Sequence, residues 1–161
     1  MSSSIFSDQD IDLIIELGRE LTGTQLDRLK HSVVIHNLAS RINQLGKSSL
    51  EEYLQFVEDH DDEMPYLTSA LTIHTTSWFR EANAFDQLKT ILLKQAPSYS
   101  LGKPFRVLSV ACSTGEEVYS IASILESTKL KSPQFDYSVE GWDVDPISLR
   151  TAKSGRYDSN L

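Results

Sequence analysis

A run of small residues between an apolar stretch and an acidic one is the first feature of this sequence that could do chemistry. Residues 107–117 read Val-Leu-Ser-Val-Ala-Cys-Ser-Thr-Gly-Glu-Glu. The apolar start predicts a buried strand, and Ser113 and Glu116 have the spacing of a capping box, which predicts that a helix follows at once. Small residues let a ligand approach the backbone, and a helix start presents unpaired N–H groups. The segment therefore predicts the first strand-to-helix turn of an α/β site for a nucleotide or nucleoside.

Taken alone, this turn is a weak pattern. It lacks the Gly-x-Gly-x-x-Gly of dinucleotide binding and the Lys-Ser/Thr end of a phosphate loop, so a nucleotide-dependent oxidoreductase or a kinase is disfavoured. An ordinary βα turn without a ligand would account for about half of such matches. A second group of residues is needed to decide between these interpretations.

Two acidic residues supply that second group at the end of the next expected strand. Residues 137–142 are followed by Asp143, Val144, Asp145 and Pro146. A carboxylate at the end of the second strand reads ribose hydroxyls in this architecture, because it can accept two hydrogen bonds from a vicinal diol. Asp145 followed by Pro146 is typical of an N-cap and the first helical residue. We therefore expect Asp143 to face the ligand and Asp145 to begin a helix, with a purely structural Asp143 as the alternative.

Other reactive groups give weaker signals. Cys112 is the one cysteine, and no neighbour in sequence looks like an activating base, so a buried structural thiol is favoured over a nucleophile. A single thiol cannot form an internal disulfide, which fits a reducing cytoplasm. The acidic residues 58–63 lack the spacing of a calcium loop. We expect that turn to be solvated and expect no metal site.

Two kinds of structure must position these groups. Residues 5 to about 95 carry helical periodicity only, whereas residues 105–153 alternate strand, helix, strand and helix. This order predicts an α+β chain, with an all-helical N-terminal domain followed by the first part of an α/β Rossmann-like domain whose sheet is truncated. The strand at 105–110 is apolar enough to be covered on both faces. Helices are expected over residues 8–21, 25–45, a stretch that begins at Ser49, 64–72 and 83–95.

Charge and hydropathy exclude several classes of protein. The formal net charge is -8 over 161 residues, which argues against a general nucleic-acid binder. No apolar run approaches the ~20 residues that span a bilayer, and the N-terminus lacks the pattern of a secretory signal. We therefore expect a soluble cytoplasmic protein with no membrane insertion.

One face of the second expected helix carries polar and basic residues. Lys30, Asn37, Arg41 and Gln44 share this face because they are spaced by seven, eleven and fourteen residues from the first of them. On charge pattern alone, a solvated edge is favoured. The alternative is a basic docking face for an acidic partner helix.

Three ordered segments resemble the family of chemotaxis receptor methyltransferases. Residues 111–120, Ala-Cys-Ser-Thr-Gly-Glu-Glu-Val-Tyr-Ser, are similar to its Gly-Cys-Ser-Thr-Gly-Glu-Glu-Pro-Tyr-Ser signature. Residues 75–81 resemble its Thr-x-Phe-Phe-Arg-Glu segment, and residues 141–145 and 152–157 resemble its Asp-Ile-Asp strand end and Ala-x-x-Gly-x-Tyr helix exit. With the N-terminal helices, the resemblance covers essentially the whole chain. The departures are Ala111 for Gly, Val118 for Pro, Trp78 for Phe, and His36 where the family often has a basic residue.

The resemblance implies an S-adenosylmethionine-binding protein of two domains. Residues 1–75 would form a helical receptor-recognition domain, and residues 76–161 a partial methyltransferase domain. In the family, the arginine at position 80 contacts the methionine carboxylate, which suits a guanidinium fork, while Glu117 lies near the amino group and Asp143 reads the ribose. The implied cofactor-binding residues are Thr76, Arg80, Ala111, Ser113, Gly115, Glu117 and Asp143.

The implied activity is transfer of a methyl group from S-adenosylmethionine to glutamate side chains of chemotaxis receptors, within signal transduction. Positioning and a cationic sulfur carry this reaction, without a covalent enzyme intermediate. The implied partners are the cytoplasmic helices of receptors, with Lys30 and Arg41 on the second helix as receptor-binding residues. The alternative is a non-catalytic module whose helical domain binds a receptor or regulator, and whose methyltransferase domain is vestigial or completed by a partner.

The family's methyltransferase domain continues well beyond the last residue of this chain. Two strands cannot hold a doubly wound sheet alone. We therefore expect an N-terminal fragment that is incomplete and inactive by itself, with its substrate-facing catalytic residues beyond Leu161. The sequence predicts neither the receptor that is modified nor the oligomeric state.

Overall fold

The chain divides into two compact units in a computed structural model that describes residues 6–23, 25, 31–99 and 103–158. The first unit comprises Met1–His74 with Val144–Ile147, and the second comprises Thr75–Asp143 with Ser148–Leu161. Each unit has a hydrophobic core of its own. The predicted fold class is confirmed, because the first unit is built from helices and the second contains the strands.

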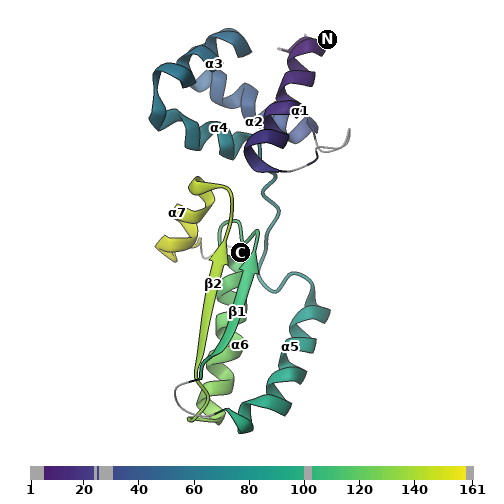
Figure 1. Cartoon of the computed structure of the whole chain (residues 1–161), viewed down its shortest axis with the longest axis vertical. Helices are drawn as coiled ribbons and strands as arrows, with labels where there is room; N and C mark the ends of the chain where they lie inside the picture. Colours follow the sequence, from purple (N-terminus) through teal and green to yellow (C-terminus); the bar gives the residue numbers. More distant parts are fainter. Residues whose placement is uncertain (1–5, 24, 26–30, 100–102, 159–161) are drawn as a thin grey trace. The chain divides into compact units, whose positions relative to one another are not determined.

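The first unit packs its helices around one apolar cluster. It contains α1 (Asp8–Thr22), α2 (His31–Gln44), α3 (Leu50–Asp59), a 3-10 turn η1 (Asp61–Glu63) and α4 (Met64–Ala70) (Figure 1). Three side chains of α2 at helical spacing are fully buried and form an apolar stripe in this cluster. The fully buried side chains of this cluster are Ile14, Val34, Leu38, Ile42, Tyr53 and Leu71.

The helix ends of the first unit follow local sequence signals. Ser7 caps α1 by accepting from the backbone N–H of Asp10, whose carboxylate accepts from Ser7 in return. Gly23 ends α1 in the left-handed conformation, with φ of 70°. Ser49 caps α3 by accepting from the backbone N–H of Glu52, whose carboxylate accepts from Ser48. Within the described ranges, no helix is both long and apolar enough to cross a bilayer.

The second unit is built on a strand–helix–strand motif. Its elements are α5 (Ala82–Gln95), a 3-10 turn η2 (Ala96–Ser98), β1 (Phe105–Val110), α6 (Glu116–Lys131), β2 (Tyr137–Trp142) and most of α7 (Pro146–Ser154) (Figure 1). The strands β1 and β2 are parallel, with Phe105 opposite Tyr137 and Val110 opposite Trp142. The crossover through α6 brings the ends of both strands to one edge of the sheet, where the turn at 111–115 and Asp143 lie.

The two faces of this sheet differ in cover. Alternate strand residues, including Phe105 and Val107, pack against the core that α5 and α6 contribute. On the opposite face, Leu108, Val110 and Trp142 are 46%, 70% and 60% exposed. The prediction that β1 is covered on both faces is therefore wrong for the described residues. The physical reason is that both packed helices cover the same face of the sheet.

Candidate functional site

The turn between β1 and α6 has an unusual backbone. Ala111, Ser113 and Gly115 have φ of 60°, 49° and 97°, all in the left-handed region. This conformation costs an ordinary L-residue about 1–2 kcal/mol, so Ala111 and Ser113 require other contacts to hold them there.

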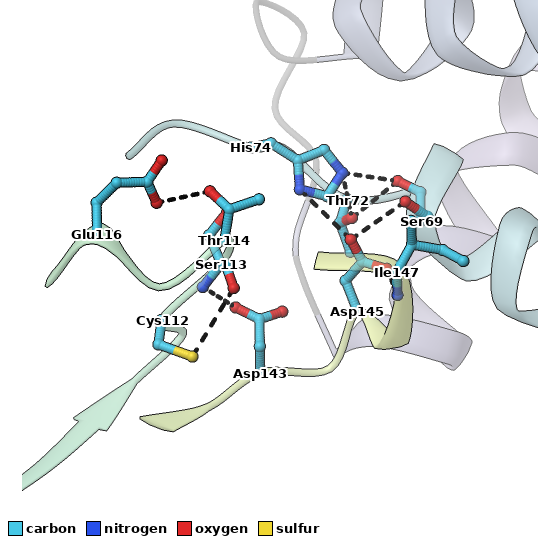
Figure 2. A network of polar contacts seen from close by, with 10 residues as sticks. All are labelled: Ser69, Thr72, His74, Cys112, Ser113, Thr114, Glu116, Asp143, Asp145 and Ile147. Atoms are coloured by element: carbon cyan, nitrogen blue, oxygen red, sulfur yellow. Dashed lines mark hydrogen bonds and ion pairs between the residues drawn. The ribbon is translucent and has the colours of Figure 1, made fainter. Parts of the chain in front are cut away.

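Three hydrogen bonds from backbone N–H groups hold the turn. The N–H of Cys112 donates to the carbonyl of Trp142 at 3.0 Å, which extends the strand pairing past the ends of β1 and β2. The N–H of Gly115 donates to the carbonyl of Cys112 at 2.9 Å. The N–H of Ser113 donates to Oδ2 of Asp143 at 2.7 Å (Figure 2). The structure therefore brings together two predicted site residues, Ser113 and Asp143, that are 30 positions apart in sequence.

Gly115 begins α6 in a space that admits only glycine. A Cβ atom there would lie 2.8 Å from Cβ of Ala152 and 2.9 Å from the hydroxyl of Tyr157. Gly115 is the N-cap of α6, without a side-chain cap for the first helical N–H groups. Because the helix begins at Glu116, the predicted capping box of Ser113 and Glu116 is wrong. The Glu116 carboxylate instead accepts from the hydroxyl of Thr114 at 2.6 Å (Figure 2).

The hydroxyl of Ser113 is a buried polar atom without a hydrogen-bond partner among the described residues. The residue is 9% exposed. A buried polar group left in this state costs about 1–3 kcal/mol, a cost that a polar ligand or a water removes. Together with the uncapped start of α6, this hydroxyl gives the turn unused hydrogen-bonding capacity. The turn therefore fits a small polar ligand that lies against its backbone.

Glu117 lies on the first turn of α6 and is oriented by the strand beneath it. The hydroxyl of Ser109 donates to Oε1 of Glu117 at 2.7 Å, and Ser109 is buried on the covered face of β1. Sequence reasoning did not identify Ser109. The sequence feature that could have identified it is a serine at an inward-facing position of a mostly apolar strand. A buried hydroxyl at such a position needs a hydrogen-bond partner.

Cys112 has the surroundings of a structural thiol. It is 3% exposed, and a Cβ atom added to Gly141 would lie 2.9 Å from its Sγ. Burial raises the pKa of the Cys112 thiol, and the negative charge of Asp143 adds to this effect. The thiol is therefore protonated at neutral pH, which agrees with the structural role expected for it.

The segment 75–81 carries the predicted residues Thr76 and Arg80. The N–H of Phe79 donates to the hydroxyl of Ser120 at 3.1 Å, and the Ser120 hydroxyl donates to the carbonyl of Glu116. The segment is therefore fastened to the first turn of α6. The guanidinium of Arg80 donates to the carbonyl of Thr75. That Thr76 and Arg80 bind a cofactor stays a prediction.

Asp145 begins α7, as predicted. Its Oδ1 accepts from the N–H of Ile147 at 2.9 Å, and the residue is fully buried. Its Oδ2 accepts from the hydroxyl of Ser69 at 3.1 Å and lies 3.6 Å from Nδ1 of His74 (Figure 2). These contacts lie within the first unit, to which Val144–Ile147 belongs. The two acids that end β2 therefore have different surroundings, since Asp143 contacts the turn and Asp145 contacts α7 and Ser69.

Arg41, a predicted receptor-binding residue, is part of a closed polar cluster in the first unit. Its Nε and Nη2 donate to the two carboxylate oxygens of Glu63 at 2.7 and 2.6 Å, and the Tyr53 hydroxyl donates to Oε1 at 3.0 Å. The guanidinium also lies 4.0 Å from the ring centre of Tyr66. The hydrogen bonds with Glu63 raise the pKa of Arg41, so this side chain is charged at all ordinary pH values.

This cluster corrects one expectation about the acidic turn. Glu63 is 5% exposed, so the prediction that residues 58–63 are all solvated is wrong for it. A buried carboxylate needs a paired charge, and Arg41 supplies it across 22 positions of sequence. Nor is Arg41 a solvated edge residue, because its side chain is 22% exposed. Its role in receptor binding stays a prediction, and Lys30 lies outside the described residues.

A hollow of about 450 Å³ lies elsewhere in the second unit, between α5 and α6. Its walls are largely apolar and include Leu92, Ala96 and Ile124, with Lys89 and Lys131 also among the lining residues. It shares no residue with the turn at 111–115 and is therefore a separate groove.

Comparisons with known proteins agree with this geometry. Residues 74–161 match the family described as "CheR methyltransferase, SAM binding domain", and residues 9–72 match "CheR methyltransferase, all-alpha domain". A chemotaxis protein methyltransferase of Escherichia coli is 33% identical over 153 residues, which cover 94% of this chain and 51% of that protein. A probable chemotaxis protein methyltransferase of Rhizobium etli is 33% identical over 144 residues, which cover 86% of this chain and 53% of that protein.

A third relative carries a different description. A probable biofilm formation methyltransferase, WspC, of Pseudomonas putida is 30% identical over 142 residues, which cover 88% of this chain and 33% of that protein. The chain thus spans about half the length of the two chemotaxis relatives and a third of the length of WspC.

Proposed function

The chain belongs to the CheR methyltransferase family, and from this premise we propose that it forms the receptor-recognition and cofactor-binding part of a protein-glutamate O-methyltransferase. The family's SAM-binding domain indicates S-adenosylmethionine as the cofactor. The proposed reaction is methyl transfer to glutamate carboxylates of chemotaxis receptors. The names of the Escherichia coli and Rhizobium etli relatives support a role in chemotaxis.

One observation carries the cofactor part of this proposal, namely the contact between the Ser113 N–H and the Asp143 carboxylate. It joins the small-residue turn to the acid that ends β2, the two features that a nucleoside site in this architecture needs. The buried Ser113 hydroxyl is a further polar group in the same turn. An ordinary βα turn requires neither the acid nor the unpaired hydroxyl.

Each proposed contact follows from the chemistry of a side chain. Asp143 would accept hydrogen bonds from the ribose hydroxyls, and the backbone at Gly115 would lie against the cofactor. Glu117, oriented by Ser109, would hold the amino group, and the Arg80 fork would pair with the carboxylate. When bound, the cofactor supplies a methyl group on a positively charged sulfur, which is the electrophile of the reaction. The protein's own contribution is to bind and orient this group.

Calorimetric titration with S-adenosylhomocysteine tests the cofactor site on this chain. We expect Asp143→Asn to weaken binding about 10-fold or more, because hydrogen bonds to a charged group contribute about 1.5–3 kcal/mol. Asp136→Asn is the matched control, since Asp136 is an acid of the same unit that pairs with Lys129. The control should stay within about twofold of the parent chain. Equal affinities for all three proteins, or no binding by the parent chain, would contradict the cofactor site.

The receptor-binding part of the proposal concerns α2. Polar side chains of α2, including His36, Asn37 and Ser40, line a hollow of about 340 Å³ next to Arg41. The family's second helix is implicated in receptor recognition, and a polar surface with a nearby cation suits an acidic partner helix. We propose that Lys30 and Arg41 contribute to this surface.

Fluorescence anisotropy with a labelled acidic helix from a receptor's cytoplasmic region tests this surface. We expect Lys30→Ala to weaken binding about threefold at low salt, an effect typical of losing one charged side chain from a binding surface. Lys47→Ala is the control, because Lys47 lies over the ring of Phe56 after α2. Receptor-helix binding that survives Arg80→Ala and Asp143→Asn, but not Lys30→Ala and Arg41→Ala, would favour the alternative, a non-catalytic binding module.

A further inference from the structure

We propose that Tyr157 is a positioning residue whose hydroxyl fixes the peptide between Thr114 and Gly115, and with it the start of α6. The hydroxyl donates to the Thr114 carbonyl at 2.7 Å from a position 43 residues later in the chain. The effect on cofactor binding rests on the proposed function, whereas the effect on the turn does not.

The peptide between Thr114 and Gly115 is held at both of its ends. A peptide bond is planar, and its carbonyl and N–H point in opposite directions. The carbonyl of Thr114 accepts from Tyr157, and the N–H of Gly115 donates to the carbonyl of Cys112 at 2.9 Å. Rotation of this peptide unit would therefore break two hydrogen bonds.

The backbone next to this peptide is strained. Ser113, one residue before the peptide, has φ of 49° in the left-handed region, whereas the φ of 97° at Gly115 suits glycine. An ordinary residue in this region is about 1–2 kcal/mol above its preferred conformation. Loss of the bond from Tyr157 would let the turn relax, and the first N–H groups of α6 would change direction with it.

The ring of Tyr157 is itself held in place. It meets Trp78 edge to face at 4.9 Å and Tyr119 at 5.8 Å, measured between ring centres. Gly155, with φ of 59°, changes the direction of the chain between the end of α7 and Tyr157. The hydroxyl therefore reaches Thr114 from a ring with fixed surroundings, as a positioning role requires.

The hydroxyl also keeps its proton. Burial raises the pKa of Tyr157 to about 12, and the negative charge of Glu116 adds to the shift. The group is therefore a hydrogen-bond donor at neutral pH.

Tyr119 provides a matched control for the test. Its hydroxyl also donates to a backbone carbonyl, that of Ala152, at 2.9 Å, and its ring belongs to the same aromatic cluster. In the described structure this hydroxyl bonds to Ala152 and not to the peptide at 114–115, so Tyr119→Phe removes a similar hydrogen bond from a different place. A purely packing role for Tyr157 would make the two variants alike.

The experiment compares the parent chain, Tyr157→Phe and Tyr119→Phe in two measurements. Residue-resolved amide hydrogen exchange reports on Gly115, with Leu92 in the core of α5 as the internal reference, and calorimetry gives the affinity for S-adenosylhomocysteine. We expect Tyr157→Phe to speed exchange at Gly115 about 10-fold relative to Leu92 and to weaken binding about 10-fold. Tyr119→Phe should leave both quantities within about twofold.

The two measurements separate the inference from the proposed function. Unchanged exchange at Gly115 in Tyr157→Phe would overturn the positioning role, whatever the affinity. Faster exchange at Gly115 in a parent chain that binds no S-adenosylhomocysteine would support the positioning role and refute the cofactor site. Faster exchange with unchanged affinity would limit Tyr157 to the turn and overturn its part in cofactor binding.

Discussion

Two carboxylates, Glu63 in the first unit and Asp143 in the second, differ in how completely the polar groups around them are hydrogen-bonded. Glu63 accepts three hydrogen bonds from Arg41 and Tyr53, and the cluster is closed around it. Asp143 lies at a turn that contains a buried hydroxyl without a partner and left-handed backbone on either side of it. Buried polar groups that are fully hydrogen-bonded stabilise a fold, whereas a buried polar group with spare hydrogen-bonding capacity can bind a ligand. We therefore assign the cluster at Glu63 to stability and propose ligand binding for the turn at Asp143.

The largest effect in this comparison is expected from Arg41→Ala. It leaves the Glu63 carboxylate buried without its charge partner, and removing one member of a buried pair costs about 3–5 kcal/mol. Urea unfolding of the first unit should detect this loss, whereas S-adenosylhomocysteine affinity should change little. Glu58→Ala is the control, since Glu58 is exposed in the same acidic region. A loss below about 1 kcal/mol would mean that the cluster is not structural.

Gly115→Ala is expected to have the next largest effect, at the turn itself. The added Cβ would meet Ala152 at 2.8 Å and Tyr157 at 2.9 Å, in addition to the strain of φ at 97°. We expect a loss of about 2–3 kcal/mol in unfolding free energy together with loss of cofactor binding. Gly46→Ala isolates the backbone strain, because Gly46 has φ of 66° and open space around its Cβ position. Equal losses for the two variants would show that the space at Gly115 is not restrictive.

Ser113→Ala separates stability from binding most clearly. Removing a buried hydroxyl that has no partner should leave the unfolding free energy unchanged or raise it by about 1 kcal/mol, while cofactor affinity falls. The control, Ser120→Ala, removes a buried hydroxyl that accepts from Phe79 and donates to Glu116, so it should destabilise by about 1–2 kcal/mol. Paired unfolding and titration measurements test both. A destabilised Ser113→Ala would indicate that this hydroxyl is already satisfied.

The sequence predicted local features better than contacts across the chain. Asp145 caps the start of α7 as expected, because a cap is a contact between residues two or three positions apart. The two strands and the proximity of Ser113 to Asp143 could also be predicted from the sequence. A parallel strand–helix–strand unit brings the ends of both strands together.

Contacts between residues with no shared local pattern could not be predicted. The pairing of Arg41 with Glu63 depends on how α2 and η1 pack, and both residues look like surface charges in sequence. The bond from Tyr157 to Thr114 depends on the path of the chain after α7. The capping box at Ser113 failed for a related reason, because the left-handed Gly115 delays the start of α6. In each case, tertiary packing overrides what the local pattern favours.

The smallest effect is expected from Ala111→Gly, which tests whether the turn carries strain. Ala111 is exposed and has φ of 60°, a conformation that glycine adopts without the penalty of about 1–2 kcal/mol. Glycine also gains freedom in the unfolded chain, so we expect a net stabilisation of only about 0.5 kcal/mol in urea unfolding. Ala122→Gly, inside α6, should instead destabilise by about 1 kcal/mol. If both variants lose stability equally, Ala111 is unstrained, and the turn differs from the closed cluster of Glu63 only in its unpaired hydroxyl.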